Sequence, residues 1–253
     1  MKHGTGPELC HRVLWIGIGI LCLGAPLWAA SRAEPYLKKS DDWFASADGR
    51  RVADNILTWQ TNEGIWPKNT DTTSKPYAGR IEKLEGIFDN GATTGEMRFL
   101  ARSYRVTRDD RYRQAFDRGL NAILKAQYST GGWPQKLPPG PGYSRHITFN
   151  DDAMVRLMYL VRDVGRLPDF DFVDADRRKA AAAAFDRGID CILKCQIVVN
   201  GKKTVWCAQH DEKDLRPRSA RSYELPSLSG AESGGILRLL MSIENPSPQV
   251  IEA

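Results

Sequence analysis

Ala115-Phe-Asp-Arg-Gly-Leu-Asn-Ala-Ile-Leu-Lys-Ala-Gln127 is the stretch that decides the fold, because the chain repeats it. It returns 69 residues later as Ala184-Phe-Asp-Arg-Gly-Ile-Asp-Cys-Ile-Leu-Lys-Cys-Gln196, with nine of the thirteen positions identical. A shorter copy, Ile56-Leu-Thr-Trp-Gln60, stands 67 residues before the equivalent Ile123-Leu-Lys-Ala-Gln127. Solenoids repeat every 20 to 50 residues or so, whereas this spacing leaves room for two helices and a long loop in each unit.

The repeated stretch has the apolar spacing of an amphipathic helix. In one copy Phe116, Leu120 and Ile123 lie at positions i, i+4 and i+7, and the next copy keeps this spacing. Another helical pattern precedes each copy, over residues 94–105 and 151–164. Each repeat therefore predicts two helices joined by a short turn.

Three long loops follow equivalent helix ends, at residues 61–91, 128–149 and 197–229. Loops that leave equivalent ends lie on the same side of a repeat protein, and that side commonly carries the function. Strand patterns are nearly absent. We therefore predict an all-α fold, a ring of helical hairpins with the functional loops on one side.

The C-terminal segment departs from this pattern. A further helix is expected over residues 229–242, where Leu237-Arg-Leu-Leu240 matches Met97-Arg-Phe-Leu100 of the first repeat. The Pro-containing residues 244–252 do not continue the helical pattern, so the partner of this helix is missing. We expect a truncated or divergent C-terminus and a ring that is incomplete there.

The N-terminal residues 1–30 are typical of a signal peptide. Lys2 and Arg12 precede an apolar run that ends in alanines, and cleavage after Ala29, Ala30 or Ala33 fits the pattern. An uncleaved anchor is the alternative, although the run is barely long enough to span a bilayer. We expect an exported chain, secreted or periplasmic, that has no membrane contact after cleavage.

The charge and cysteine content of the exported chain limit the kinds of partner that it is expected to bind. Removing residues 1–33 leaves 33 basic and 30 acidic residues, so the net charge falls from +5 to +3. Without a Lys/Arg block or a nucleic-acid motif, this balance favours an acidic polymer over nucleic acid. The spacing of Cys191, Cys195 and Cys207 completes no zinc site and indicates structural cysteines, with pairing of Cys207 to a neighbour left open.

The long loops and their borders are dense in short motifs, which are Gly64-Ile-Trp-Pro-Lys68, Phe88-Asp-Asn-Gly-Ala-Thr-Thr94, Gly131-Gly-Trp-Pro-Gln135, His146-Ile-Thr-Phe-Asn-Asp-Asp-Ala-Met154, Trp206-Cys-Ala-Gln-His-Asp211 and Ala220-Arg-Ser-Tyr-Glu224. In combination they resemble the family 10 pectate lyases over residues 41–241. The resemblance implies a monomeric α/α toroid, similar to an (α/α)3 barrel, formed by one catalytic domain over residues 34–253. It also implies calcium-assisted β-elimination of polygalacturonate.

Acidic and amide residues occupy equivalent places before two of the helices. Asp89 and Asn90 close the first long loop, and Asn150, Asp151 and Asp152 close the second. Hard oxygen ligands brought together in a ring suit Ca²⁺. Helix N-capping is the alternative explanation. With the resemblance we assign Asp89, Asp151 and Asn90 to the metal and Asp152 to the substrate or to capping.

The resemblance also implies an arginine as the base, and Arg221 matches that position. A free arginine is effectively always protonated, so this role requires a pocket that disfavours the charge of Arg221. The alternative is a structural arginine, ion-paired with Glu224.

Other loop residues are candidates for substrate binding. Basic groups can bind uronate carboxylates, and an aromatic ring can stack on a sugar, but a solvated basic rim and a structural tryptophan wedge are the alternatives. Neither histidine has a Ser or Cys partner at nucleophile spacing. The predicted substrate contacts are Arg218, Lys136, Arg145, His146, Trp133, Tyr223, His210 and Asp152.

Two other functions remain open. Paired carboxylates such as Asp89 and Asp151 also suit a toroidal glycoside hydrolase. An incomplete ring also suits a protein that binds pectin without cleaving it, or a defunct homologue.

Overall fold

The structure, a computed structural model, describes Met1 and residues 31–253. The signal-peptide prediction falls on residues that, apart from Met1, lie outside this range. In the described part no helix has both the length and the apolar character needed to cross a membrane. The domain expected over residues 34–253 lies entirely within it.

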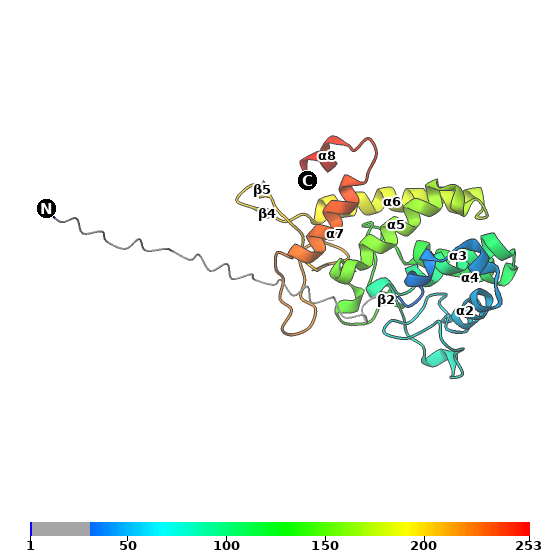
Figure 1. Ribbon diagram of the computed structural model, residues 1–253. Helices are drawn as coiled ribbons and strands as arrows, with labels where there is room; N and C mark the ends of the chain where they lie inside the picture. The colour runs from blue at the N-terminus through cyan, green and yellow to red at the C-terminus, as the bar shows by residue number, and fades with distance from the viewer. Residues whose placement is uncertain (2–30) are drawn as a thin grey trace.

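The described chain forms the expected all-α toroid of helical hairpins. Successive helices pack in pairs, α3 against α4 and α5 against α6 (Figure 1). The α-helices are α1 (Asp41–Ala45), α2 (Ala47–Thr58), α3 (Thr94–Thr107), α4 (Asp110–Ala126), α5 (Ala153–Arg166), α6 (Ala175–Cys195), α7 (Gly230–Met241) and α8 (Pro248–Glu252). The 3₁₀ helices are η1 (Glu34–Lys38), η2 (Ile81–Lys83), η3 (Asp89–Gly91), η4 (Tyr143–Arg145), η5 (Asn150–Asp152) and η6 (Pro168–Phe170).

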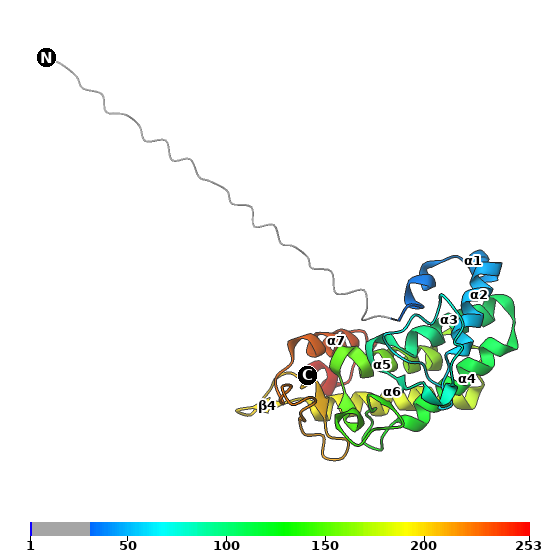
Figure 2. The same cartoon turned by 90° about the horizontal axis from the view of Figure 1, so that it is seen from below.

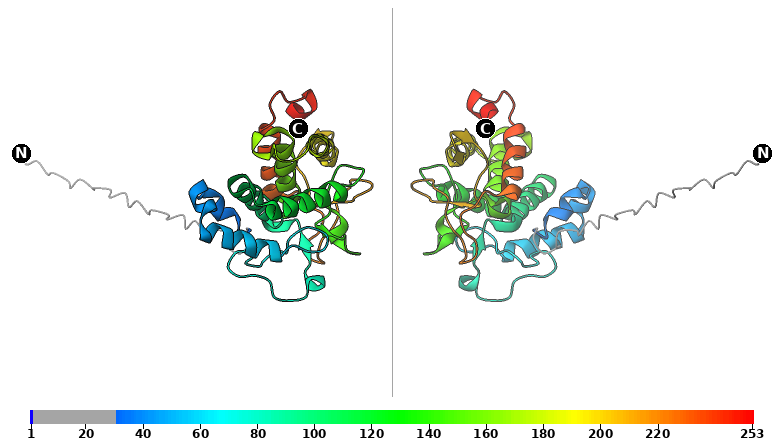
Figure 3. Two further views of the ribbon diagram at one scale, coloured as in Figure 1. Left: turned by 90° about the vertical axis from the view of Figure 1, so that its right-hand side faces the viewer. Right: turned by 90° about the vertical axis from the view of Figure 1, so that its left-hand side faces the viewer.

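The helices stand in two rows. Figure 2 shows α3, α5 and α7 following one another across the molecule, and the contacts of α3 with α5 and of α5 with α7 agree. A second row contains α2, α4 and α6, each in contact with the next. The first helices and the last helices lie on opposite sides of the molecule, with α3 to α6 between them (Figure 3).

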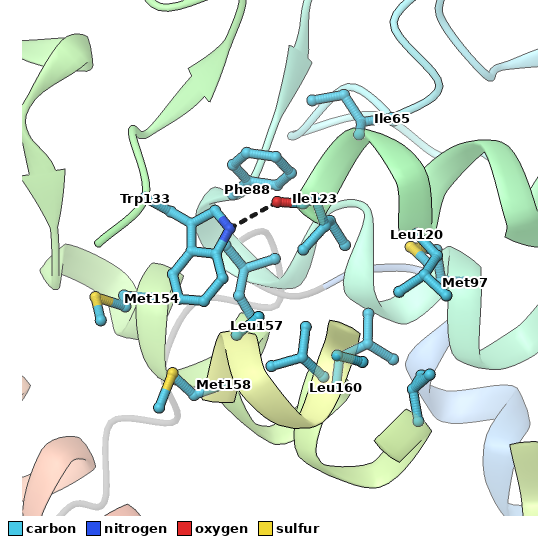
Figure 4. Packing of buried hydrophobic residues seen from close by; sticks show 14 of the residues in the cluster. Ile65, Phe88, Met97, Leu120, Ile123, Trp133, Met154, Leu157, Met158 and Leu160 are labelled. Carbon is cyan, nitrogen blue, oxygen red and sulfur yellow. Dashed lines mark hydrogen bonds between the residues drawn. The ribbon is translucent and has the colours of Figure 1, made fainter. Parts of the chain in front are cut away.

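The apolar core lies between the rows and under the loops. Trp133 is fully buried, close to Phe88, Met154 and Leu157 (Figure 4). Its ring nitrogen donates to the carbonyl oxygen of Ile123, which opens the short repeat motif. All three loop tryptophans make this bond, Trp66 to Ile56 at 2.8 Å, Trp133 to Ile123 at 2.8 Å and Trp206 to Ile192 at 2.7 Å. The recurring tryptophan is therefore a wedge that fixes each loop to its own helix.

The recurring glutamine joins one repeat to the next. The Gln127 side-chain nitrogen donates to the carbonyl of Gly131 in its own loop and to that of Ala184 in the next copy, both at 2.8 Å. The Gln127 side-chain oxygen accepts from Arg187 of the same next copy. Gln60 makes the corresponding bonds one repeat earlier. The joint thus uses the glutamine that ends one copy and the Ala and Arg of the Ala-Phe-Asp-Arg-Gly that opens the next.

Short antiparallel ladders join neighbouring loops. β1 (Gly86–Ile87) pairs with β2 (Lys136–Leu137), with Gly86 opposite Leu137. β3 (Ile147–Thr148) pairs with β6 (Gln209–His210) in the same way, with Ile147 opposite His210. β4 (Val198–Val199) and β5 (Lys202–Lys203) form a hairpin around Asn200-Gly201, both with positive φ as a tight turn requires.

The C-terminal segment differs from the prediction. The expected helix over residues 229–242 is confirmed as α7, but the next residues form the one-turn helix α8 rather than a fully irregular tail. The Ser247 hydroxyl accepts from the Val250 N–H, and Pro248 takes the first helical position, where its missing N–H costs nothing. Two residues that read as helix breakers thus start a helix.

All three cysteines of the described chain are buried and free, as their structural assignment requires. The Sγ atoms of Cys191 and Cys195 stand 4.0 Å apart on α6. Cys207 lies against the carbonyl of Arg218, so the pairing left open for it is not present.

Candidate active site on the loop side

Two of the predicted metal ligands meet where the first two long loops end. η3 and η5 are in contact, although they lie about one repeat apart in the chain. Asn90 has φ 55° and Asp151 has φ 53°, the left-handed conformation that Asn and Asp tolerate better than most residues. The same turn therefore presents a polar side chain from each repeat to a shared place.

Asp89 is the buried member of this group, at 1% exposure. Its Oδ2 atom accepts from Lys68 Nζ and, at 3.1 Å, from Gln135 Nε2. Its Oδ1 atom is buried and has no hydrogen-bond partner among the described residues. A buried carboxylate oxygen without a donor is costly, so this atom is suited to a cation.

Asp151 lies at the rim beside Asp89. Partial burial raises the pKa of Asp151 to about 6, and the nearby negative charge of Asp89 adds to this effect. Asn150 donates to Asp151 Oδ2 at 2.7 Å. Two carboxylates this close repel each other when both are ionised, and a cation between them removes that penalty.

The donor set fits Ca²⁺. Asp89, Asp151 and Asn90 offer carboxylate and amide oxygens, the ligands that Ca²⁺ takes, and one of these oxygens is otherwise orphaned. The capping alternative gains no support at either place. The N-cap residues are Thr93 for α3 and Asp152 for α5, and neither makes a side-chain cap bond.

Asp152 lies against the second turn of α7. A side chain added at Gly235 would place its Cβ 2.0 Å from Asp152 Oδ1, so glycine is needed for this close approach. Asp152 thus helps to position α7 beside the site.

Arg221 lies in the third loop and is paired with Glu224, as the structural alternative anticipated. Its Nε atom donates to Glu224 Oε2 at 2.9 Å, and its backbone N–H donates to the same oxygen. This pairing raises the pKa of Arg221 further above its usual value and lowers the pKa of Glu224 to about 2. In this arrangement Arg221 is a cation.

A groove lies between the third long loop, η5 and α7. It has a volume of about 370 Å³, and its lining includes Asn150 from η5, Tyr223 and Glu224 from the third loop, and Glu232 from α7. Tyr223 is 72% exposed and free to meet a sugar, and the Arg221 guanidinium lies 5.0 Å from its ring centre. The groove thus brings together the segments that contain the predicted base and a predicted metal ligand.

Most of the predicted basic contacts are held by acidic neighbours. Lys136 Nζ contacts Glu85, and Arg218 Nε donates to Asp211 at 2.9 Å. Arg145 Nε donates to Glu212 at 3.1 Å.

His146 is 8% exposed and lies 3.1 Å from Glu212 through its Nδ1 atom. His146, Asp211 and Glu212 converge closely enough to hold a metal, but Arg145 and Arg218 already satisfy the two carboxylates. These contacts join the second long loop to the third beside the β3–β6 ladder.

Two predicted sugar contacts are wrong for this structure. Trp133 is fully buried and cannot present its ring to a ligand, because it wedges its loop onto α4. His210 is also fully buried. Its Nδ1 atom bonds with the carbonyl of Leu215, its Nε2 accepts from the N–H of Cys207, and burial lowers its pKa. His210 is thus a neutral residue that orders the third loop.

Lys68 and Gln135 are site residues that the prediction did not assign. They occupy the same place in Gly64-Ile-Trp-Pro-Lys68 and Gly131-Gly-Trp-Pro-Gln135, two residues after the wedge tryptophan, and both contact Asp89 Oδ2. That equivalence is a signal in the sequence that could have identified them.

Comparison with known proteins agrees with this architecture. The family model described as pectic acid lyase matches residues 60–253. The chain belongs to the pectic acid lyase family. A search of curated proteins found no match.

Two solved structures resemble this chain along most of its length. One is a mutant of the family 10 polysaccharide lyase from Cellvibrio cellulosa in complex with trigalacturonic acid, at 39% identity and a TM-score of 0.74, covering 84% of this chain and 68% of the other. The other is the family 10 polysaccharide lyase from the same organism, at 38% identity and a TM-score of 0.73, covering 86% of this chain and 68% of that one. The chain thus belongs among the family 10 polysaccharide lyases.

Proposed function

We propose that this pectic acid lyase is exported and cleaves polygalacturonate by calcium-dependent β-elimination, with Arg221 as the base. The observation that carries the proposal is the buried, unpartnered Asp89 Oδ1 atom beside Asp151. Binding of trigalacturonic acid by a protein 39% identical supports a uronate substrate. The signal-like residues 1–30 support export.

Elimination from a uronate requires three things, a more acidic C5 proton, a base that removes it, and stabilisation of the negative charge that develops on the carboxylate. Calcium bound to the substrate carboxylate supplies the first and the third. Asp89, Asp151 and Asn90 would hold the ion. Lys68 fixes the orientation of Asp89 by binding its other oxygen.

Arg221 would take the C5 proton. The C5–H bond breaks and its electrons form the C4–C5 double bond, while the O4 leaving group departs and accepts a proton. Arg221 can accept a proton only in its neutral form, so substrate binding must separate it from Glu224, which now holds it as a cation. The exposure of this pair, 55% for Arg221, leaves room for that separation.

The deciding experiment follows the ultraviolet absorbance of polygalacturonate with the purified chain. The unsaturated product absorbs, and its growth should require calcium and stop with a chelator. Arg221→Ala should keep the fold and lose turnover, while the exposed neighbour variant Arg216→Ala should retain it. Normal turnover by Arg221→Ala would reject the base assignment.

The same assay separates the alternatives. Saturated products with new reducing ends would indicate a hydrolase, which also uses paired carboxylates. Tight binding of polygalacturonate by a folded chain, with neither product, would indicate a binding protein.

A further inference from the structure

The residues just after the signal-like segment belong to the folded core. Ala33 is fully buried and Ser31 is 7% exposed. Gly95 on α3 makes room for them, because a Cβ there would lie 2.4 Å from Ser31 Oγ. Glu34 then bonds to Arg156 on α5 at 2.6 Å. The chain from Ser31 onward is therefore a structural part of the first two repeats.

Ser31 contacts a buried carboxylate that forms no ion pair with any of the described residues. Glu96, on α3, is 1% exposed. Its Oε1 atom accepts from Ser31 Oγ at 2.7 Å and from Thr72 Oγ1 at 3.1 Å. Its Oε2 atom is buried and has no partner among the described residues. Burial raises the pKa of Glu96 to about 6, because the hydroxyl and backbone hydrogen bonds that lower it do not replace the water that a carboxylate loses.

We propose that the exported chain is cut between Ala30 and Ser31, and that the ammonium group released on Ser31 binds Glu96 inside the protein. A signal peptidase would hydrolyse this peptide bond, which consumes one water and leaves a carboxylate on Ala30 and an ammonium on Ser31. The Ser31 nitrogen is three bonds from its Oγ, so the ammonium lies within about 4 Å of the atom that already touches Glu96. The proposal rests on export but not on lyase activity.

The other cleavage positions fit the contacts less well. Cleavage after Ala33 would remove Ser31, a donor to Glu96, together with Ala33, a core residue. Cleavage after Ala29 would leave Ser31 in an amide bond, which has one neutral N–H instead of a charged group. Only cleavage after Ala30 places a cation beside Glu96, and a buried carboxylate is stabilised mainly by such a partner.

The first test is the N-terminus of the exported protein. The full chain is expressed with its own leader, and the exported form is examined by intact mass and N-terminal sequencing. The expected first residue is Ser31. A first residue of Ala30 or Glu34, or an uncut chain, would overturn the proposal.

The second test measures whether the Ser31 amine is paired. The native exported protein is treated with an acetylating reagent near pH 7, where a free α-amine reacts before lysine because its pKa is lower. Pairing with Glu96 should protect the amine, and Glu96→Gln should accelerate its acetylation by about tenfold or more. Glu34→Gln is the matched control and should leave the rate unchanged, because Glu34 bonds to Arg156 instead.

If Glu96→Gln does not fold, the acetylation rate is measured in Ser31→Ala, which keeps the N-terminal amine and loses only the hydroxyl. Its amine should stay protected, since the charge and not the hydroxyl makes the pair. Acetylation of the Ser31 amine in the native wild-type protein as fast as in the unfolded protein would refute the pairing, whatever the position of the cut.

Discussion

The ends of the repeated helices and the turns that close the long loops, here called the rims, belong to the same repeats of this lyase. They differ in which side chains and bonds recur from copy to copy. At the helix ends, the tryptophan wedge and the glutamine bond recur with nearly the same atoms and distances. At the rims, equivalent turns present Asp89-Asn90 in one copy and Asn150-Asp151 in the next. The first region needs the same packing in every unit, whereas the second assembles one asymmetric site from different units.

This comparison separates residues that hold the fold from residues that act on a ligand. The tryptophan wedge is buried, the glutamine is buried or half-buried, and both have their partners within the protein. Asp89 Oδ1 is buried without one, and Tyr223 is exposed beside the groove. Substitutions in the two regions should therefore change different measured quantities.

The largest loss of stability is expected from Trp133→Ala. It removes a fully buried indole and its bond to Ile123, so the free energy of unfolding should fall by about 3–5 kcal/mol. Urea unfolding measures this. Tyr223→Ala should change the free energy of unfolding by less than about 0.5 kcal/mol, since its ring is exposed. Equal losses of unfolding free energy in the two variants would contradict the distinction between residues that hold the fold and residues that act on a ligand.

Asp89→Asn should affect catalysis rather than folding. It removes half of the carboxylate pair, so kcat should fall by about a thousandfold if the metal stabilises the transition state by several kcal/mol. The rise in Tm on adding calcium should disappear with it. Asp152→Asn is the control, and should keep this calcium effect because Asp152 packs against α7. A calcium response that survives in Asp89→Asn would place the ion elsewhere.

Gln127→Ala and Gln196→Ala compare two copies of the same glutamine, of which Gln196 donates to the carbonyls of Thr204 and Ala253. Gln127 has partners for both ends of its amide, and removing it leaves the carbonyls of Gly131 and Ala184 with one donor fewer. We expect a cost of about 1–3 kcal/mol. Gln196 Oε1 has no partner among the described residues, so Gln196→Ala should cost less. Equal values would mean that the third copy is as well satisfied as the second.

Glu224→Gln should have the smallest effect of these substitutions, which is a shift in the pH dependence of activity. Glu224 raises the pKa of Arg221, so neutralising Glu224 lowers that pKa and makes the neutral base available at lower pH. The pH profile of kcat/KM, which reports the free enzyme in which the pair is formed, should move toward lower pH, and kcat/KM on its rising limb should increase by roughly two- to fivefold, because the pair is exposed. No shift, with full activity, would argue against Arg221 as the base.

The sequence predicted the scaffold well because its periodicity records the packing. The helices expected at residues 94–105 and 151–164 end within two residues of α3 and α5. The alternation of helices and long loops likewise follows from a pattern that each copy repeats. The C-terminal turn α8 was missed because Pro and Ser were read as breakers, although at a helix start they favour the helix.

The site was harder to predict because residue type does not reveal burial. Trp133 and His210 suit a sugar site by chemistry, but both lie inside the protein. Arg145 and Arg218 were read as free cations, but both are paired. Glu212, the partner of Arg145, stands far from it in the chain, and Asp211, the partner of Arg218, stands close to it. The pair of Arg145 with Glu212 depends on how two loops meet, and the pair of Arg218 with Asp211 depends on how one loop folds back, and no local pattern records either.

The glutamine bond also bears on how such a chain could have arisen. The segment from Ala115 to Gln127 contains both halves of the joint, since Ala115 accepts from the copy before it and Gln127 donates to the copy after it. A tandem duplication of that segment therefore creates a compatible interface at once, without a second mutation. The loops between joints were then free to diverge, and one copy could acquire an aspartate where another kept asparagine.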